Sequence, residues 1–231
     1  MSAGAKAASI ESTASGATRD AVTIAARDLS HRYGPRVALQ GVSFRFDGPS
    51  VVVVRGPNGS GKSTLLRLLA GLLRPTSGDA SVILEGRTIA AKDRHRVLGY
   101  AGPDLAFYPE LTALENLSFA AEARGCPAPR ARALEGLERV GLRERAADRA
   151  GALSSGMAQR LRLAFALLDD PSLLLLDEPG SHLDDEGRAA LHALIGREGA
   201  RRLVVVATND EREDALAGQR VELRRGVGHS A

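Results

Sequence analysis

The 231-residue chain has no tryptophan, only three tyrosines and five phenylalanines, and a single cysteine, Cys126. One cysteine excludes an internal disulfide, which fits a reducing compartment. So few aromatic side chains offer little material for the platforms on which single-stranded nucleic acids stack. The formal net charge is only +3, and the basic residues between Arg124 and Arg149 alternate with acidic ones, as on solvent-exposed helices. We therefore expect no nucleic-acid partner.

Long apolar runs are also missing. A membrane-spanning helix needs roughly 18 consecutive apolar residues, whereas the longest runs here, 51–54 and 173–176, have the length of buried strands. The first 20 residues are rich in Ala, Ser, Thr and Gly, lack the apolar segment of a signal peptide, and contain the acidic Glu11 and Asp20. We predict a disordered tail over residues 1–20, one folded domain over 21–231, and a cytoplasmic location.

The pattern of apolar residues predicts strands separated by one long helical region. Strands are expected at residues 22–30, 41–46, 50–54, 81–84, 97–101, 172–177 and 203–207. A helix should begin at Gly61, and residues 111–168 should be largely helical. This order is not a uniform β–α alternation. It predicts an α/β fold with a parallel sheet, an antiparallel β flap made by the first strands, and a helical lobe inserted at about residues 105–165.

The segment GPNGSGKS at residues 56–63 matches the phosphate-binding loop G-x-x-x-x-G-K-[ST], with a predicted strand before it and a helix after it. In such a loop the backbone N–H groups surround the phosphates, Lys62 reaches the β and γ phosphates, and the Ser63 hydroxyl binds Mg²⁺. A chance glycine turn is the alternative. The predicted nucleotide contacts of this loop are Gly56, Pro57, Asn58, Gly59, Ser60, Gly61, Lys62, Ser63 and Thr64. The sequence thus predicts a P-loop NTPase core that uses ATP and Mg²⁺.

The segment LLLLDEP at residues 173–179 supplies two carboxylates at the end of a buried strand. Asp177 can hold the magnesium shell, together with Ser63, while Glu178 can orient or deprotonate the attacking water. Acidic residues at a strand end can also simply cap the next turn. Following a phosphate loop at this distance, the catalytic interpretation is favoured.

A third segment, LSSGMAQRLRLAFALL at residues 153–168, begins a helix with small residues. Ser154, Ser155 and Gly156 leave the first backbone N–H groups uncovered, and such a helix N-terminus attracts anions. The segment therefore predicts a phosphate contact. The alternative is ordinary capping, because serine is a frequent N-cap residue.

In order and spacing, the segments GPNGSGKST, LSSGMAQR, LLLLDEP and SHLD resemble the ATP-binding subunit of an ABC transporter, over about Val22 to Leu223. The resemblance implies that the signature helix of each chain faces ATP held by the other chain, so that Ser154 and Gly156 donate to a γ-phosphate across a head-to-tail dimer. It also implies that Tyr33 stacks on adenine. The alternative for Tyr33 is packing on the flap.

The resemblance further implies an ATPase domain that works as a homodimer, or with a paralogous ATPase subunit, and drives a transmembrane permease subunit from the cytoplasmic face of the membrane. The stretch YPELTALENL at residues 108–117 is similar to the haem-exporter type of subunit. Two alternatives remain open: a soluble, non-transport ATPase of the same superfamily, and a slow nucleotide sensor.

Three departures from the family pattern bear on chemistry. Ser155 and Met157 replace the usual glycine and glutamine of the signature. Asp104 stands where most members carry a glutamine that contacts magnesium and water, so it adds negative charge near the γ-phosphate. Asn209 stands where a histidine is usual, and its neutral amide can donate without titrating near neutral pH. We therefore predict Glu178, Asn209 and Asp104 as catalytic residues. Capping of a short helix after residue 209 is the alternative for Asn209.

Overall fold

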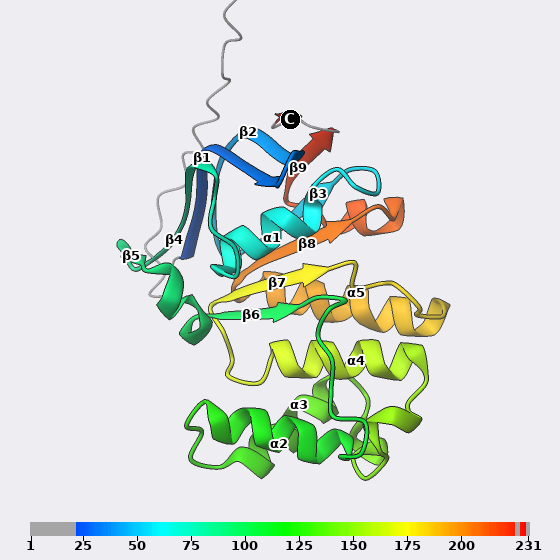
Figure 1. The fold of residues 1–231 in the computed structure, drawn as a ribbon. Helices are drawn as coiled ribbons and strands as arrows, with labels where there is room; N and C mark the ends of the chain where they lie inside the picture. Colours follow the sequence, from blue (N-terminus) through cyan, green and yellow to red (C-terminus); the bar gives the residue numbers. More distant parts are fainter. Residues whose placement is uncertain (1–21, 225–226, 230–231) are drawn as a thin grey trace, which may run out of the picture.

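The computed structural model describes residues 22–224 and 227–229 and contains two sheets with helices packed around them (Figure 1). The tail predicted over residues 1–20 lies outside the described residues. Within them, no helix combines the length and the apolar character needed to cross a membrane.

The smaller sheet is antiparallel throughout, with the strand order β2-β1-β4-β5. Its strands are β1 (Val22–Tyr33), β2 (Arg36–Asp47), β4 (Ser77–Leu84) and β5 (Arg87–Ile89). Apolar residues of its inner face, such as Ile24 and Leu29, are 1% and 0% exposed. This is the antiparallel flap that the sequence predicts, and β5 is a short edge strand that the apolar pattern did not reveal.

The larger sheet has the strand order β10-β9-β3-β8-β7-β6. Its strands are β3 (Ser50–Arg55), β6 (Leu98–Ala101), β7 (Leu173–Asp177), β8 (Leu203–Thr208), β9 (Gln219–Arg224) and β10 (Val227–His229). All neighbours from β9 to β6 pair in parallel, and β10 pairs antiparallel with β9. The middle residues of the central strands are apolar because both faces of these strands are buried.

Three hydrophobic clusters divide the interior. The first joins α1 (Lys62–Ala70) and the flap to one face of the large sheet. The second packs α5 (Asp185–Gly199) and part of α4 (Ser155–Ala166) against the other face. The sequence prediction of a parallel-sheet core is confirmed, and both sheet faces are buried as the apolar strands require.

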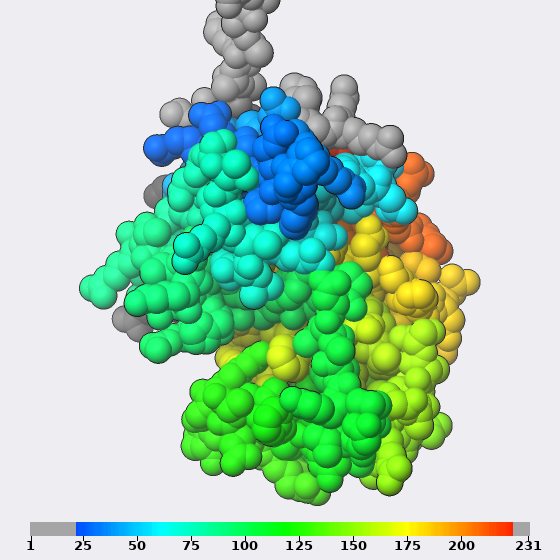
Figure 2. Space-filling view, in the orientation of Figure 1, coloured from blue at the N-terminus to red at the C-terminus, as the bar shows by residue number. Residues whose placement is uncertain are grey.

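The third cluster joins α2 (Ala113–Ala123) and α3 (Pro129–Arg139) to the opposite side of α4. In Figure 2 a notch on one side separates the green surface of this region from the blue-green surface of residues near 90. The described residues also form four short 3₁₀ helices: η1 (Ala91–Arg96), η2 (Arg143–Arg145), η3 (Ala150–Ala152) and η4 (Glu211–Leu216). Since α4 contributes to two clusters, it ties the helical region to the sheet.

Candidate functional site

The phosphate loop lies between the end of β3 and the start of α1. Gly61 has a φ of +102°, and a Cβ there would lie 2.4 Å from the Ala38 carbonyl oxygen, so glycine is required for both backbone angle and space. Lys62 follows as the first helical residue. Its side chain is 5% exposed, and Nζ donates to the Gly56 carbonyl at 2.8 Å. The loop is therefore folded tightly around the lysine that the motif requires.

Asp177 ends β7 and faces the first turn of α1. Its Oδ1 accepts a hydrogen bond from the Ser63 hydroxyl at 3.0 Å, while Oδ2 is buried without a hydrogen-bond partner. Burial raises the pKa of Asp177, and the Ser63 hydrogen bond opposes this shift. A buried, unpaired carboxylate oxygen beside a hydroxyl is a set of hard oxygen donors, which suits Mg²⁺. The two residues predicted as metal ligands are thus brought together, and they fit the ion.

Glu178 is the next residue after β7. Its Oε1 lies 3.1 Å from Lys62 Nζ, and its backbone has a φ of +49°, which is unusual for a residue with a side chain. Such a conformation is held only where the surroundings enforce it, and it is common at functional sites. The Glu178 amide donates to the Ala207 carbonyl of β8 at 2.8 Å, which fixes the turn that carries the carboxylate.

The start of α4 is arranged differently. The Ser154 hydroxyl accepts a hydrogen bond from the Met157 amide at 3.2 Å, so Ser154 is an N-cap, as the alternative interpretation proposed. Capping satisfies only one of the first N–H groups of a helix, so it leaves the anion-binding prediction open. A Cβ on Gly156 would lie 3.1 Å from the His182 carbonyl oxygen, so the helix start packs against the loop after β7.

Tyr33 lies at the end of β1 and is 43% exposed. Its ring meets the His31 ring edge-on, with 4.6 Å between the centroids. Tyr33 therefore contacts the flap through His31 while much of the side chain remains open to solvent. Stacking on adenine stays a prediction for this ring.

Asp104 has a partner that the sequence reasoning missed. Its carboxylate, 66% exposed, forms an ion pair with the guanidinium of Arg67 on α1. Arg67 follows Ser63 by four residues, about one helical turn, so both side chains lie on one face of α1. This spacing places Arg67 near the phosphate loop, but it does not identify Asp104 as its partner. The cation offsets the negative charge that Asp104 brings to this edge of the site.

Asn209 follows β8 by one residue, and its side-chain amide donates to Asn58 Oδ1 of the phosphate loop at 3.0 Å. The helix cap is the neighbouring residue Asp210, whose side chain accepts from the Arg212 amide. The alternative in which Asn209 caps this helix is therefore wrong. Its side chain instead lies against the phosphate loop.

Glu178 and Asn209 line a common cavity of about 210 Å³. The other residues that line it are Gly180, Ser181, His182, Arg188, Thr208, Asp210 and Glu213. The structure therefore brings the predicted base and the predicted amide donor to one space, close to the phosphate loop. Arg188, Asp210 and Glu213 are further residues of this space that motif spacing did not reveal.

Comparison with known proteins agrees with this geometry. The family model described as ABC transporter matches residues 39–181. An ABC transporter ATP-binding protein of Thermotoga maritima is 41% identical over 189 residues, which cover 77% of this chain and 80% of that protein. The ABC transporter ATP-binding protein YxlF of Bacillus subtilis is also 41% identical over 189 residues. That match covers 81% of this chain but 62% of YxlF, so the chain spans less than two thirds of this relative.

The fold matches solved structures as well. The bacterial ABC transporter cassette MJ0796, solved as a dimer, superposes with a TM-score of 0.79 at 26% identity, covering 89% of this chain and 96% of that one. A post-hydrolysis state of MJ0796 with ADP and Pi gives the same TM-score at 25% identity. The phosphate loop, the acidic end of β7 and the signature helix occupy one cassette fold, and the chain belongs to the ABC transporter family as an ATP-binding ATPase cassette.

Proposed function

We propose that two cassettes, either two copies of this chain or this chain and a paralogous ATPase subunit, enclose two ATP molecules with Mg²⁺ and hydrolyse them to power transport through a separate transmembrane permease subunit. The cassette would work at the cytoplasmic face of the membrane. The relatives support this role, because they include the sn-glycerol-3-phosphate import ATP-binding protein UgpC 2 of Agrobacterium fabrum, which is 35% identical over 213 residues.

The convergence of four side chains carries the proposal. Lys62 is buried with its ammonium beside Glu178, and Ser63 bonds to Asp177. In hydrolysis, Lys62 holds the β and γ phosphates, and Glu178 accepts a proton from the attacking water. Ser63 and Asp177 would hold Mg²⁺, which would supply positive charge against the negative charge of the phosphates.

The start of α4 supports the pairing of two cassettes. Within the described chain, the contacts that hold Ser154 and Gly156 come from α4 itself and from the loop after β7, and none comes from the phosphate loop. An uncovered helix N-terminus of this kind binds anions well. We propose that its anion is the γ-phosphate of ATP bound to the other cassette.

Steady-state ATP hydrolysis tests the enzymatic part of the proposal. The wild-type chain should hydrolyse ATP, and Glu178→Gln should bind ATP with wild-type affinity while losing turnover. The matched control is Glu186→Gln, because Glu186 is an exposed acid in the first turn of α5. Equal turnover in the wild type and Glu178→Gln would show that Glu178 is not the general base.

A slow nucleotide sensor is the second candidate, and Asp104 and Asn209 favour it because they replace the family's glutamine and histidine. The pairing of Asp104 with Arg67 reduces its repulsion of phosphate, and Asn209 keeps a donor against the phosphate loop. Both contacts support the ATPase over the sensor. Measuring wild-type turnover with and without a co-purified permease separates the two: no turnover in either sample selects the sensor.

A further inference from the structure

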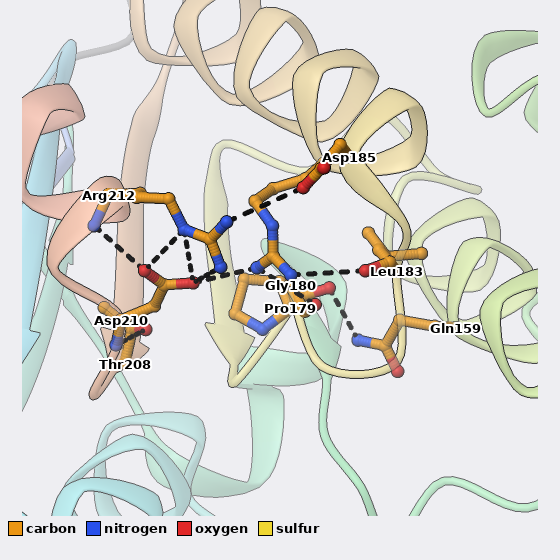
Figure 3. A network of polar contacts seen from close by, with 9 residues as sticks. Gln159, Pro179, Gly180, Leu183, Asp185, Thr208, Asp210 and Arg212 are labelled. Carbon is orange, nitrogen blue, oxygen red and sulfur yellow. Dashed lines mark hydrogen bonds and ion pairs between the residues drawn. The ribbon is translucent and has the colours of Figure 1, made fainter.

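A partly buried arginine, Arg188, joins the two loops that line the cavity beside Glu178. Arg188 lies in the first turns of α5, and its side chain is 17% exposed. Its guanidinium contacts Gly180 and Leu183 in the loop after β7 and Asp210 in the loop after β8, three residues that Figure 3 labels. The phosphate-binding motifs do not include this residue, and the proposed chemistry does not use it.

The Arg188 guanidinium contacts backbone carbonyls of the loop after β7. Nη2 donates to the Leu183 carbonyl at 3.2 Å, and Nη1 approaches the Gly180 carbonyl at 3.5 Å. The Ser181 amide in turn donates to the carbonyl of Glu178 at 3.2 Å. Arg188 therefore restrains the segment that directly follows the proposed base.

At the loop after β8, Arg188 Nη1 donates to Asp210 Oδ2 at 2.8 Å. Asp210 is fixed further because its amide donates to the Thr208 hydroxyl at 2.9 Å. Asn209 lies between these two residues in sequence, so its backbone is held at both ends. Its amide reaches Asn58 of the phosphate loop at 3.0 Å.

The network continues to the start of the signature helix. Gln159 of α4 is buried, and its Nε2 donates to the Pro179 carbonyl at 3.1 Å. The same loop packs its His182 carbonyl against Gly156. The loop after β7 is thus held by α4 on one side and by Arg188 on the other, as Figure 3 shows for Gln159, Pro179 and Leu183.

From this geometry we propose that Arg188 is a positioning residue for ATP hydrolysis: through Asp210 and the carbonyls of Gly180 and Leu183, it sets the position of Asn209 relative to Glu178 and the signature helix. The inference rests on the proposed ATPase function. An arginine suits this role because its rigid, planar set of donors can hold several acceptors in a fixed arrangement.

Arg212 provides a matched control, because it binds the same carboxylate, Asp210, as Arg188 does. Arg212 also binds Asp210, with Nη2 at 2.9 Å from Oδ2, but its remaining ion pair is to the exposed Asp185. The side-chain hydrogen bonds to the Gly180 and Leu183 carbonyls come from Arg188, not from Arg212. Arg188→Met and Arg212→Met therefore remove the same charge from the same partner, and the first also releases the loop.

The experiment measures ATP turnover and ATP affinity for both variants. Displacing reacting groups by about 1 Å can cost about 10²-fold in rate, so Arg188→Met should lower kcat by about 10- to 100-fold with KM changed less than about threefold. Arg188→Lys should recover part of the loss. Arg212→Met should stay within about twofold of wild type, because it leaves the loop carbonyls bound.

A double-variant cycle separates positioning from a general loss of stability. If Arg188 acts by positioning Asn209, Arg188→Met should have little left to disturb in a chain that already carries Asn209→Ala. The double variant should then have a kcat less than about threefold below that of Asn209→Ala alone. Full additivity, or equal losses in Arg188→Met and Arg212→Met, would overturn the proposal. Should Arg188→Met fail to fold, Asp210→Asn decides, because it keeps a capping side chain and removes the ion pair; an unchanged kcat there also overturns the proposal.

A second readout does not depend on hydrolysis. The side-chain amide of Asn209 gives its own NMR signal, which Arg188→Met should shift and Arg212→Met should leave in place. If the wild type hydrolyses no ATP, the proposed function fails while this signal still decides the role of Arg188. An Asn209 signal that is identical in wild type and Arg188→Met contradicts the positioning role.

Discussion

The two ends of the proposed ATP site differ in how fully one chain completes them. At the phosphate loop, the side chains of Lys62 and Asp177 are 5% and 2% exposed and are held by partners from the same chain. At the start of α4, Ser154 is exposed and Gly156 half-buried, and a helix N-terminus is left open. One chain therefore closes the first end by itself, whereas we propose that an ATP phosphate bound to another cassette completes the second.

This difference explains why the phosphate-loop motif indicates its ligand from one chain, whereas the signature motif does not. The phosphate loop can be read from one chain because β3, the glycines and α1 position all its groups. The signature helix also begins with exposed or half-buried small residues, but no contact within the described chain indicates its ligand. The role that we propose for it therefore requires a second cassette, and MJ0796, which has the same fold, was solved as a dimer.

The largest expected effect is a loss of ATP affinity when the phosphate loop is changed. Lys62→Ala removes a buried ammonium, and because hydrogen bonds to charged groups contribute about 1.5 to 3 kcal/mol, ATP affinity should fall by about 10- to 100-fold. Titration with a fluorescent ATP analogue measures this. Lys92→Ala is the control, because Lys92 is exposed on η1. Unchanged affinity in Lys62→Ala would remove the phosphate-loop assignment.

The next effect is expected on kcat and concerns Asn209. If its amide donates to charge that develops in the transition state, Asn209→Ala should cost about 10²-fold in kcat, about 2.7 kcal/mol, with little change in ATP affinity. Asn209→His should retain turnover because it keeps a donor. Wild-type kcat in Asn209→Ala would show that the contact with Asn58 serves the loop alone.

A smaller effect concerns Asp104 and Arg67. Arg67→Met leaves the Asp104 carboxylate without its cation, so repulsion of the ATP phosphates should raise KM by about three- to tenfold. Adding Asp104→Asn should reverse most of this increase. Arg124→Met, which breaks the partly exposed pair with Asp169, serves as the control. A KM that stays raised in the double variant would assign Arg67 a direct contact with nucleotide instead.

The smallest effect is on proton binding at Asp210. The hydrogen bonds from Arg212, first its side chain and then its backbone, lower the pKa of Asp210 to about 2. Since the folded state binds this proton more weakly than the unfolded state does, the contribution to stability is present above about pH 4 and is lost as the pH falls towards 2. NMR titration of the carboxyl should give this midpoint, and Arg212→Met should raise it.

Much of the fold followed from the sequence because the central strands are uninterrupted apolar runs. The runs VVVV and LLLL became β3 and β7, and the helix after Gly61 became α1. The edge strand β5, and the strands β9 and β10 beyond β3, were not predicted, because they contain few apolar residues and so give a weak pattern.

The site was predictable where chemistry depends on local spacing. Ser63 and Asp177 meet because each motif places its residue at the same end of the parallel sheet. The pairs Arg67–Asp104 and Arg188–Asp210 join residues 37 and 22 positions apart, and no motif spacing connects them. These contacts depend on how helices pack beside loops, which only the three-dimensional structure specifies.

Dimerisation of a hydrolysis-deficient chain tests most directly whether α4 completes the site of another cassette. In Glu178→Gln, ATP and Mg²⁺ should convert the 24.3 kDa monomer to a dimer, measured by size-exclusion chromatography with light scattering. Adding Gly156→Asp should keep the chain monomeric without weakening ATP binding, because it brings a negative charge and a Cβ to the helix N-terminus. Adding Gly196→Asp instead should leave the dimer intact, since that site has open space. A Glu178→Gln chain that stays monomeric with saturating ATP, or that dimerises equally with Gly156→Asp, would contradict the account.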